Sequence, residues 1–354
     1  MPEPVRPDPV GPDLAALARA LAAVPGLGDL RLGDLALLPT KGIAHDHVRL
    51  RGRGLLARLP RPGQLAIPPD RYIPYQEASF RRAGPSGHVP RLIAAIAPSP
   101  ALPSGALVIQ EIDGRAPRLP QELTLIAECL ARIHALPVPP PAARAPLADH
   151  GDAVGGTLAV IERQAQALDA AGVAGAARAA IGEELDWARG FAAASAGRDQ
   201  PVTLVASDTH PGNYLVDAAG RAILVDVEKM LYGSPAIDLA HATLYTSTTW
   251  DIDCGVALSR ADIAGFYRDY RARIDAALGQ RLRPWLTPLR RLTWLRTTTW
   301  ACRFKAEILG RGAAGDPDSP YVRHVGARIA DFLDAATIAR IRQEWLGGET
   351  LRLD

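Results

Sequence analysis

The side chains best suited to chemistry lie together in the middle of the chain. The stretch VASDTHPGNYLVD, residues 205–217, contains Asp208 and Asn213. The stretch AILVDVEKMLYGSPAIDLAHA, residues 222–242, adds Asp226, Glu228 and Asp238. Carboxylate and amide oxygens suit Mg²⁺, which proteins hold through a few oxygens together with substrate phosphates. A further carboxylate can accept a proton from a hydroxyl nucleophile. The set therefore favours phosphoryl transfer, which needs positioning and neutralisation of charge.

Two short strands are expected to bring these side chains together. NYLVD and AILVDVE flank an Ala-Ala-Gly sequence, which is typical of a β-hairpin. Paired strands lie about 5 Å apart. Asp208 and Asn213 precede the first strand and Asp226 ends the second, so the three side chains can converge. Asn, Asp and Gly are also common in ordinary polar turns, and that reading stays open for this segment.

Composition sets the class of protein. The 354 residues are 48% hydrophobic and carry a net charge of +2, which suggests about two domains and does not indicate a nucleic-acid partner. Cys129, Cys254 and Cys302 match neither a zinc spacing nor a disulfide framework, so we expect a cytoplasmic protein. We find no apolar run long enough to span a membrane, and MPEPVRPDPVGPD does not read as a signal peptide.

Along the chain, strand patterns come first and helical patterns follow. An Asp-capped helix starts at Asp13, and HVRLRGRGLLARLP, residues 47–60, predicts a hairpin. Residues 71–82 look helical, and residues 89–97 and 105–114 look like strands. From residue 119 onward, helical spacing dominates. The order predicts a small β-rich lobe followed by a larger, mainly helical lobe.

Three motifs in order carry a family resemblance. DTHPGN at residues 208–213, VDVE at 225–228 and PAIDLA at 235–240 resemble the signature of the aminoglycoside phosphotransferase/choline kinase family. The resemblance implies an α+β, two-lobed, protein-kinase-like fold. It also implies an ATP-dependent transferase that moves the γ-phosphate to a hydroxyl of a small molecule.

The same resemblance implies roles for individual residues. Asp208 would be the catalytic base or the group that orients the hydroxyl, and Asn213 and Asp226 would hold Mg²⁺. Asp238 would buttress the catalytic loop. The family usually has a histidine two residues before the catalytic Asp, and this chain has Ala206 there.

The N-terminal third matches the family more loosely. In LLARLP, Arg58 stands where a basic residue contacts the nucleotide phosphates, and Glu77 on the following helix would pair with it. ALVIQEIDG resembles the strand and hinge that receive adenine, and PTKGIAHDH stands where the family often has two glycines. The further nucleotide contacts expected from these matches are Lys41, Gly42, Glu111 and Ile112.

These matches predict three regions. Residues 1–29 would be a flexible tail and an N-terminal helix, and residues 30–113 would form the nucleotide-binding lobe. Residues 114–354 would form the helical lobe with the catalytic loop and the acceptor site. ATP and Mg²⁺ would bind between the two lobes.

Aromatic and acidic residues suggest where an acceptor binds. Trp250, Asp251 and Trp300 fall in the region where the family binds its acceptor, and His210 lies on the loop of Asp208. Aromatic rings and carboxylates can hold an organic cation. Core packing is the alternative for each Trp. Lysine is rare in this arginine-rich chain, and Lys229 stands beside the acidic cluster, where a compact ammonium can matter.

Two other functions stay open from the residues alone. A metal-dependent phosphohydrolase could use Asp208, His210, Asp226 and Glu228 with a transition metal and no nucleotide. A catalytically inactive, kinase-like binding module could keep the fold without turnover. The acceptor, the choice between ATP and GTP, and the oligomeric state are not determined by the sequence.

Overall fold

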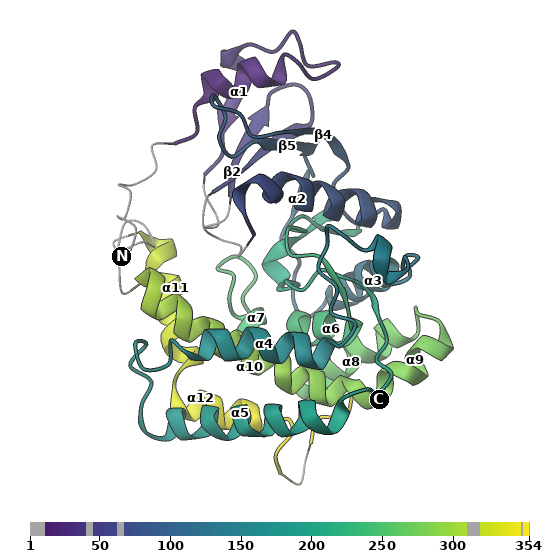
Figure 1. Cartoon of the computed structure of the whole chain (residues 1–354), viewed down its shortest axis with the longest axis vertical. Helices are drawn as coiled ribbons and strands as arrows, with labels where there is room; N and C mark the ends of the chain where they lie inside the picture. Colours follow the sequence, from purple (N-terminus) through teal and green to yellow (C-terminus); the bar gives the residue numbers. More distant parts are fainter. Residues whose placement is uncertain (1–10, 40–44, 62–66, 310–318, 348–349, 354) are drawn as a thin grey trace. The chain divides into compact units, whose positions relative to one another are not determined.

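The chain changes from a strand-rich unit to a helical unit between Glu111 and Ile112. The computed structural model describes residues 11–39, 45–61, 67–309, 319–347 and 350–353 (Figure 1). The first unit comprises Met1–Arg81 and Pro90–Glu111, and the second comprises Arg82–Val89 and Ile112–Asp354. The change falls two residues before the boundary expected at residue 113.

An antiparallel sheet forms the centre of the first unit. Its order is β1-β2-β3-β5-β4, and the predicted hairpin is confirmed as the pair β2–β3. Gly52 and Gly54 turn this hairpin with φ values of 70° and 59°, which glycine adopts without strain. The strands are β1 (Leu35–Leu37), β2 (His45–Leu50), β3 (Leu55–Pro60), β4 (Leu92–Ile96) and β5 (Ala106–Gln110).

The N-terminal helix α1 (Leu14–Leu21) is part of the core of this sheet. Asp13 caps it by accepting hydrogen bonds from the N–H groups of Ala15 and Ala16, both at 2.9 Å. Leu17 and Leu21 are fully buried in one cluster with residues of β2, β3 and β5. The sequence grouped this helix with a tail, but its apolar face makes it a part of the first unit.

Helix α2 (Pro69–Ala83) follows the hairpin and begins within the first unit. Ile73, Gln76 and Phe80 are buried, which is the i, i+3, i+7 spacing of one helix face. The segment after the helix belongs to the second unit. His88 accounts for this, because its carbonyl accepts the Leu224 N–H at 2.8 Å and its Nδ1 lies 2.8 Å from the Ala222 carbonyl oxygen.

Two small sheets lie in the second unit. The predicted hairpin of residues 214–224 is confirmed as β8 (Tyr214–Asp217) and β9 (Ala222–Leu224), with β6 (Gly114–Arg115) beside β8. The sequence did not indicate the other sheet, in which β7 (Thr203–Val205) pairs with β10 (Leu231–Gly233). Each of these strands has three residues, too few for alternation to be visible.

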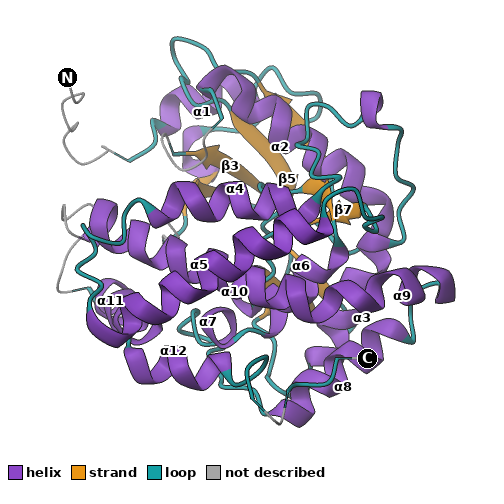
Figure 2. Ribbon diagram, turned by 60° about the horizontal axis from the view of Figure 1, so that its bottom comes forward, coloured by secondary structure: helices purple, strands orange, loops and turns teal. Residues whose placement is uncertain are grey.

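Helices make up most of the second unit (Figure 2). The long helix α10 packs against α4, α5, α6 and α11. None of the described helices combines the length and apolar composition that crossing a bilayer requires. The helices are α3 (Leu123–His134), α4 (Ala153–Ala165), α5 (Gly175–Ser195), α6 (Pro235–Thr243), α7 (Tyr245–Thr248), α8 (Arg260–Arg271), α9 (Ala276–Leu282), α10 (Leu286–Phe304), α11 (Pro320–Phe332) and α12 (Ala335–Arg342).

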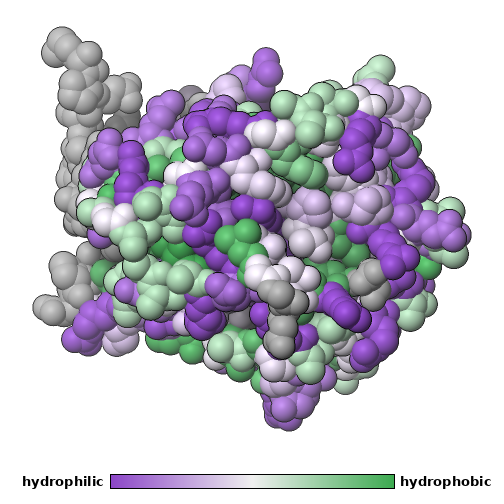
Figure 3. Space-filling model, turned by 90° about the horizontal axis from the view of Figure 1, so that it is seen from below, coloured by the Kyte–Doolittle hydropathy of each residue, from purple (hydrophilic) through white to green (hydrophobic). Residues whose placement is uncertain are grey.

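The face on the side of α5 and α12 is mostly polar. Hydrophilic residues spread across it, and apolar residues form small separate groups (Figure 3). Beneath the surface, Trp285, directly before α10, and Trp294, in the middle of α10, are fully buried. The apolar burial of the second unit is therefore internal, around α10.

A buried carboxylate joins three helices of this unit. Glu184 on α5 is fully buried and accepts hydrogen bonds from Arg291 Nε at 2.5 Å and Arg342 Nε at 2.8 Å. The Arg291 guanidinium also stacks on the Trp187 ring, 3.8 Å from its centroid. A buried charge of this kind is tolerated because its oxygens are satisfied by charged donors.

We expect Glu184→Gln to lower the free energy of unfolding by about 3 kcal/mol, since the two arginines lose their buried counter-charge. Its neighbour Glu183 is 67% exposed and pairs with Arg342, so Glu183→Gln should cost less than about 1 kcal/mol. Urea unfolding at neutral pH measures both values. If both variants lower the free energy of unfolding by the same amount, the buried Glu184 does not stabilise the packing of the three helices.

Candidate active site

Asp208 lies on the loop between β7 and β8 and is paired with a lysine. Lys229 Nζ donates to Asp208 Oδ2 at 2.5 Å. Burial is the largest single influence and would raise the pKa of Asp208, but Lys229, His210 and His241 together outweigh it and hold that pKa well below its ordinary value. Burial likewise opposes the charge of Lys229, whereas Asp208, Glu228 and Asp226 raise its pKa. Asp208 is therefore a carboxylate with one oxygen already held.

Asn213 is fixed to the same loop by its side chain. Asn213 Nδ2 donates to the Asp208 carbonyl oxygen at 2.9 Å, and the Asn213 N–H donates to the His210 carbonyl oxygen at 2.9 Å. An amide has one donor end and one acceptor end. The donor end is used within the loop, so Asn213 Oδ1 remains as the acceptor.

Asp226 reaches this region through the strand pairing. The Val225 N–H donates to the Asn213 carbonyl oxygen at 2.9 Å, so the chain beside Asp226 is tied to the chain at Asn213. The carboxylates of Asp208 and Asp226 also both raise the pKa of Lys229. The amide oxygen of Asn213 and the Asp226 carboxylate are hard oxygen donors, and they fit a magnesium ion that takes its other ligands from phosphate and water.

The four-residue arrangement expected for a phosphohydrolase is not formed. Within the described ranges, no three His, Cys, Asp or Glu side chains are grouped so that they could hold a metal ion. His210 instead lies beside His241, with ring centroids 6.4 Å apart. A metal held by Asp208, His210, Asp226 and Glu228 is therefore not supported by the geometry.

Asp238 holds the start of the loop that carries Asp208. Its two carboxylate oxygens accept the N–H groups of Ala206 and Ser207, each at 2.7 Å. His134 Nε2 lies 3.1 Å from one of these oxygens, and His134 Nδ1 lies 2.8 Å from the Tyr270 hydroxyl. The family resemblance implied that Asp238 buttresses this loop. The structure shows that the donors belong to the loop, and that His134 orients the carboxylate.

His241 is a site residue that the sequence did not reveal. It lies one turn after Asp238 on α6, and its Nδ1 accepts the Thr209 N–H at 3.0 Å. Thr209 Oγ1 donates to the Asp238 carbonyl oxygen at 2.7 Å. Burial lowers the pKa of His241 to about 3, although Asp208 opposes this shift. A neutral ring agrees with Nδ1 acting as an acceptor.

Of the two residues of the first unit that were expected to pair near the nucleotide, Arg58 is buried and Glu77 is not. Arg58 on β3 is buried, and its Nη2 lies 3.1 Å from His45 Nδ1; His45 Nε2 lies 3.2 Å from Gln76 Oε1. The expected Arg58–Glu77 pair is wrong, because Glu77 pairs with Arg81 one helical turn later, at 2.7 Å. Gln76 lies on the buried face of α2 together with Ile73 and Phe80, and Glu77 is about 100° further round the helix.

The remaining nucleotide contacts are less defined. Lys41 and Gly42 lie outside the described residues. Glu111 donates its N–H to the Gly54 carbonyl oxygen at 2.9 Å, and its side chain pairs with Arg49 at 2.6 Å. Ile112 is the first residue after the change of unit. The adenine contact expected at Glu111 and Ile112 remains a prediction.

The residues expected to bind the acceptor separate into two groups. Trp250 and Trp300 pack edge to face with centroids 5.3 Å apart, and Trp250 also contacts Phe304 and Phe332. Asp251 lies against Gly212 of the catalytic loop, where an added Cβ would come within 2.6 Å of the Asp251 Cβ and Cγ. The tryptophans thus form part of an aromatic cluster, while the acidic side chain touches the loop itself.

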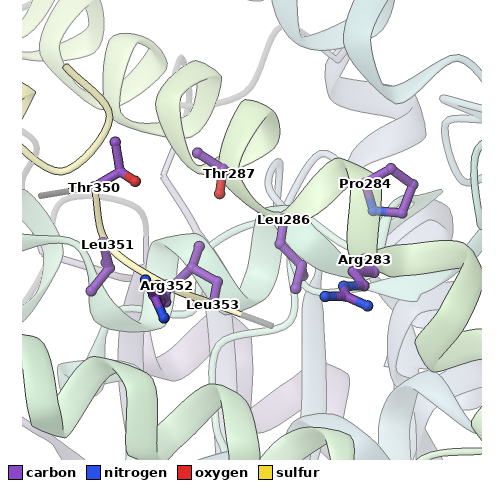
Figure 4. Close-up of a pocket in the computed structure, with 8 residues that line it drawn as sticks. All are labelled: Arg283, Pro284, Leu286, Thr287, Thr350, Leu351, Arg352 and Leu353. Carbon is purple, nitrogen blue, oxygen red and sulfur yellow. The ribbon is translucent and has the colours of Figure 1, made fainter. Parts of the chain in front are cut away.

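A pocket of about 360 Å³ lies elsewhere in the second unit (Figure 4). Its walls come from the junction before α10 and from the C-terminal segment, and no carboxylate or imidazole lines it. None of the site residues predicted from the sequence is among its lining residues, which are Arg283, Pro284, Leu286, Thr287, Thr350, Leu351, Arg352 and Leu353.

The chain belongs to the phosphotransferase enzyme family, whose model it matches over residues 38–277. Among curated proteins, no sequence matches it. Its fold is protein-kinase-like, with an antiparallel sheet in the N-terminal region and helices in the C-terminal region, as the resemblance implied.

Several solved structures share this fold. The microcompartment-associated aminopropanol kinase superposes with a TM-score of 0.60 at 18% identity, covering 97% of this chain and 100% of the kinase. A putative aminoglycoside phosphotransferase from Ralstonia eutropha gives 0.60 at 16% identity, covering 93% and 98%. A choline/ethanolamine kinase family protein from Mesorhizobium loti gives 0.56 at 18% identity, covering 93% and 99%.

His241 makes the stability of the chain depend on pH. Its pKa is about 3 when folded and near 6.5 when exposed, so its contribution is fully present above pH 6.5 and declines as the pH falls toward 3. Between pH 7.5 and 5.0 we expect this residue to account for a loss of about 2 kcal/mol.

His241→Asn keeps an acceptor for the Thr209 N–H and cannot take up a proton in this range. Urea unfolding of both proteins at pH 7.5 and 5.0 tests the assignment. We expect the variant to lose less stability on acidification than the wild type. If both proteins lose the same free energy of unfolding on acidification, His241 is not buried in its neutral form.

Proposed function

We propose that the chain is an ATP-dependent kinase that transfers the γ-phosphate to a hydroxyl group of a small organic amine. The observation that carries this proposal is the catalytic loop, in which Lys229 holds one Asp208 oxygen and the Asn213 amide is turned by the Asp208 carbonyl. Both residues then keep an oxygen that can accept a hydrogen bond: Asp208 Oδ1 accepts none from the described part of the chain, although His241 Nδ1 lies 3.8 Å from it, and Asn213 Oδ1 is the acceptor end of its amide.

Asp208 would bind the acceptor hydroxyl through Oδ1. The Lys229 ammonium fixes the carboxylate through Oδ2, so the hydroxyl is oriented by a group that cannot rotate freely. Phosphoryl transfer depends mainly on such positioning and on stabilising the charge of the transferred group. Asp208 then takes the hydroxyl proton as the acceptor oxygen bonds to the γ-phosphorus and the bond from that phosphorus to the β,γ-bridging oxygen breaks, so that ADP leaves.

Asn213 and Asp226 would hold Mg²⁺ through their side-chain oxygens. When bound, the ion neutralises the phosphate charge that develops during transfer. In the first unit, Arg58 is the buried cation of β3 and would contact the nucleotide phosphates. Lys41, Gly42, Glu111 and Ile112 complete the proposed nucleotide contacts.

An amine in the acceptor is supported by the acidic side chain next to the loop. Asp251 touches Gly212, so a carboxylate lies beside the segment that would bind the hydroxyl. A carboxylate at this place would pair with an ammonium group of the acceptor. The three similar structures described above are named for hydroxylated amines: choline or ethanolamine, aminoglycoside and aminopropanol.

Two carboxylate variants test the roles directly. We expect Asp208→Ala to keep the thermal stabilisation by Mg²⁺-ATP and to lower turnover at least about 100-fold, since the hydroxyl is no longer oriented. Asp226→Ala should lose the part of that stabilisation that requires Mg²⁺. Asp199→Ala, which removes a carboxylate that is 73% exposed, is the matched control and should behave as the wild type.

Turnover is measured as ATP consumption over a panel of amino alcohols, aminoglycosides, amine-free sugars and alcohols. Thermal shifts are recorded with Mg²⁺-ATP, with Mg²⁺ alone and with Zn²⁺ or Mn²⁺. Stabilisation by Mg²⁺-ATP without turnover on any acceptor would instead indicate a nucleotide-binding module. Full activity in Asp208→Ala or Asp226→Ala would overturn the corresponding role.

A further inference from the structure

The turn before Asp208 has an unusual backbone conformation. Ser207 has φ of 65°, and in the described part of the chain it is the one non-glycine residue with a positive φ. A side chain with a Cβ is disfavoured in this region, so such a residue persists only where its surroundings hold it. The turn at Ser207 therefore depends on the groups that bind it.

The two sides of this turn are bound by different residues. Asp238 accepts the N–H groups of Ala206 and Ser207 and holds the side that enters the turn. On the side that leaves it, Arg296 Nη2 donates to the Ser207 carbonyl oxygen at 2.8 Å and Nη1 donates to Ser207 Oγ at 3.1 Å. A planar guanidinium can make both bonds at once.

The carbonyl that Arg296 binds is directly linked to Asp208. The Ser207 C=O and the Asp208 N–H belong to one planar peptide unit. Holding the carbonyl therefore fixes the direction from which the chain enters Asp208, and with it the direction of the carboxylate. Ala206 has only a methyl side chain and cannot supply such a bond.

Arg296 is itself held in a defined place. It lies on α10, and Arg290 of the same helix donates to Thr243, the last residue of α6, through Nη1 at 2.7 Å to Oγ1. Asp238 lies on α6, so both sides of the turn are bound by elements that are tied to each other. The match to the family model ends at residue 277, before α10 begins.

We propose that Arg296 is a positioning residue that fixes the Ser207–Asp208 peptide and thereby aims the catalytic carboxylate. This inference rests on the proposed kinase function for the role of Asp208. Under this proposal, α10, which lies outside the residues matched by the family model, helps to position the loop that carries Asp208.

The test compares Arg296→Met with Arg296→Lys and with a control on the same helix. Arg303 is exposed and pairs with Glu307, so Arg303→Met removes an arginine of α10 that is not bound to the loop. Hydrogen–deuterium exchange of the peptide 203–216 requires no substrate. We expect at least tenfold faster exchange of this peptide in Arg296→Met, no change in Arg303→Met and an intermediate rate in Arg296→Lys.

The second measurement is the steady-state kinetics of phosphorylation of an acceptor identified in the ATP-consumption screen. For Arg296→Met we expect kcat to fall about 100-fold while the KM for ATP stays within about twofold, because a misdirected carboxylate slows the transfer and not the binding of nucleotide. Arg296→Lys should recover part of kcat, since an ammonium can reach one of the two acceptors.

Unchanged exchange of the peptide 203–216 in Arg296→Met, or an unchanged kcat with a raised KM for ATP, would overturn the proposal. If Arg296→Met does not fold, Arg296→Lys decides: exchange equal to that of the wild type overturns it, and faster exchange confined to this peptide supports it. If the wild type phosphorylates no acceptor, the proposed function fails, and the exchange rates still decide whether Arg296 holds the turn.

Discussion

The loop that carries Asp208 depends on one buried carboxylate. Asp238 is fully buried, and its oxygens accept two consecutive backbone N–H groups and contact His134. A charge removed from water is destabilising unless such donors replace its hydration. The same bonds attach the start of the loop to α6, and through His134 to α3. The position of Asp208 therefore depends on the hydrogen bonds that the loop donates to Asp238. Asp238 belongs to the motif PAIDLA, which lies about 30 residues after the loop in the sequence.

Local patterns were enough to predict the hairpin beside the candidate site. The spacing of Asp208, Asn213 and Asp226 around two short apolar runs indicates a hairpin, and that hairpin is present as β8 and β9. Asp13 as a helix cap and the turn at Gly52 and Gly54 were equally readable, since each depends on residues a few positions apart. The order of the motifs also indicated the protein-kinase-like fold, because motif order reflects the order of the elements along the chain.

Contacts between distant residues were not readable in the same way. A glutamate at position 77 looks suited to pair with Arg58, but helix geometry turns it to Arg81 and turns Gln76 inward. The positions of His134 and His241 relative to the loop require α3 and α6 to be packed first. No local pattern reports such packing, and an apolar or arginine-rich helix such as α10 gives no sign of which of its arginines faces a turn.

Asn213 uses the two ends of its amide for different partners. Its nitrogen is committed to the Asp208 carbonyl, so its oxygen can point in one direction only. Aspartate has almost the same shape but no hydrogen to donate. Deamidation of this residue during ageing of the protein would place two repelling oxygens inside the loop. The side chain would keep its size, but it would lose its one donor and gain a negative charge, so a single deamidation would change the bonding inside the loop while leaving the packing around it almost the same.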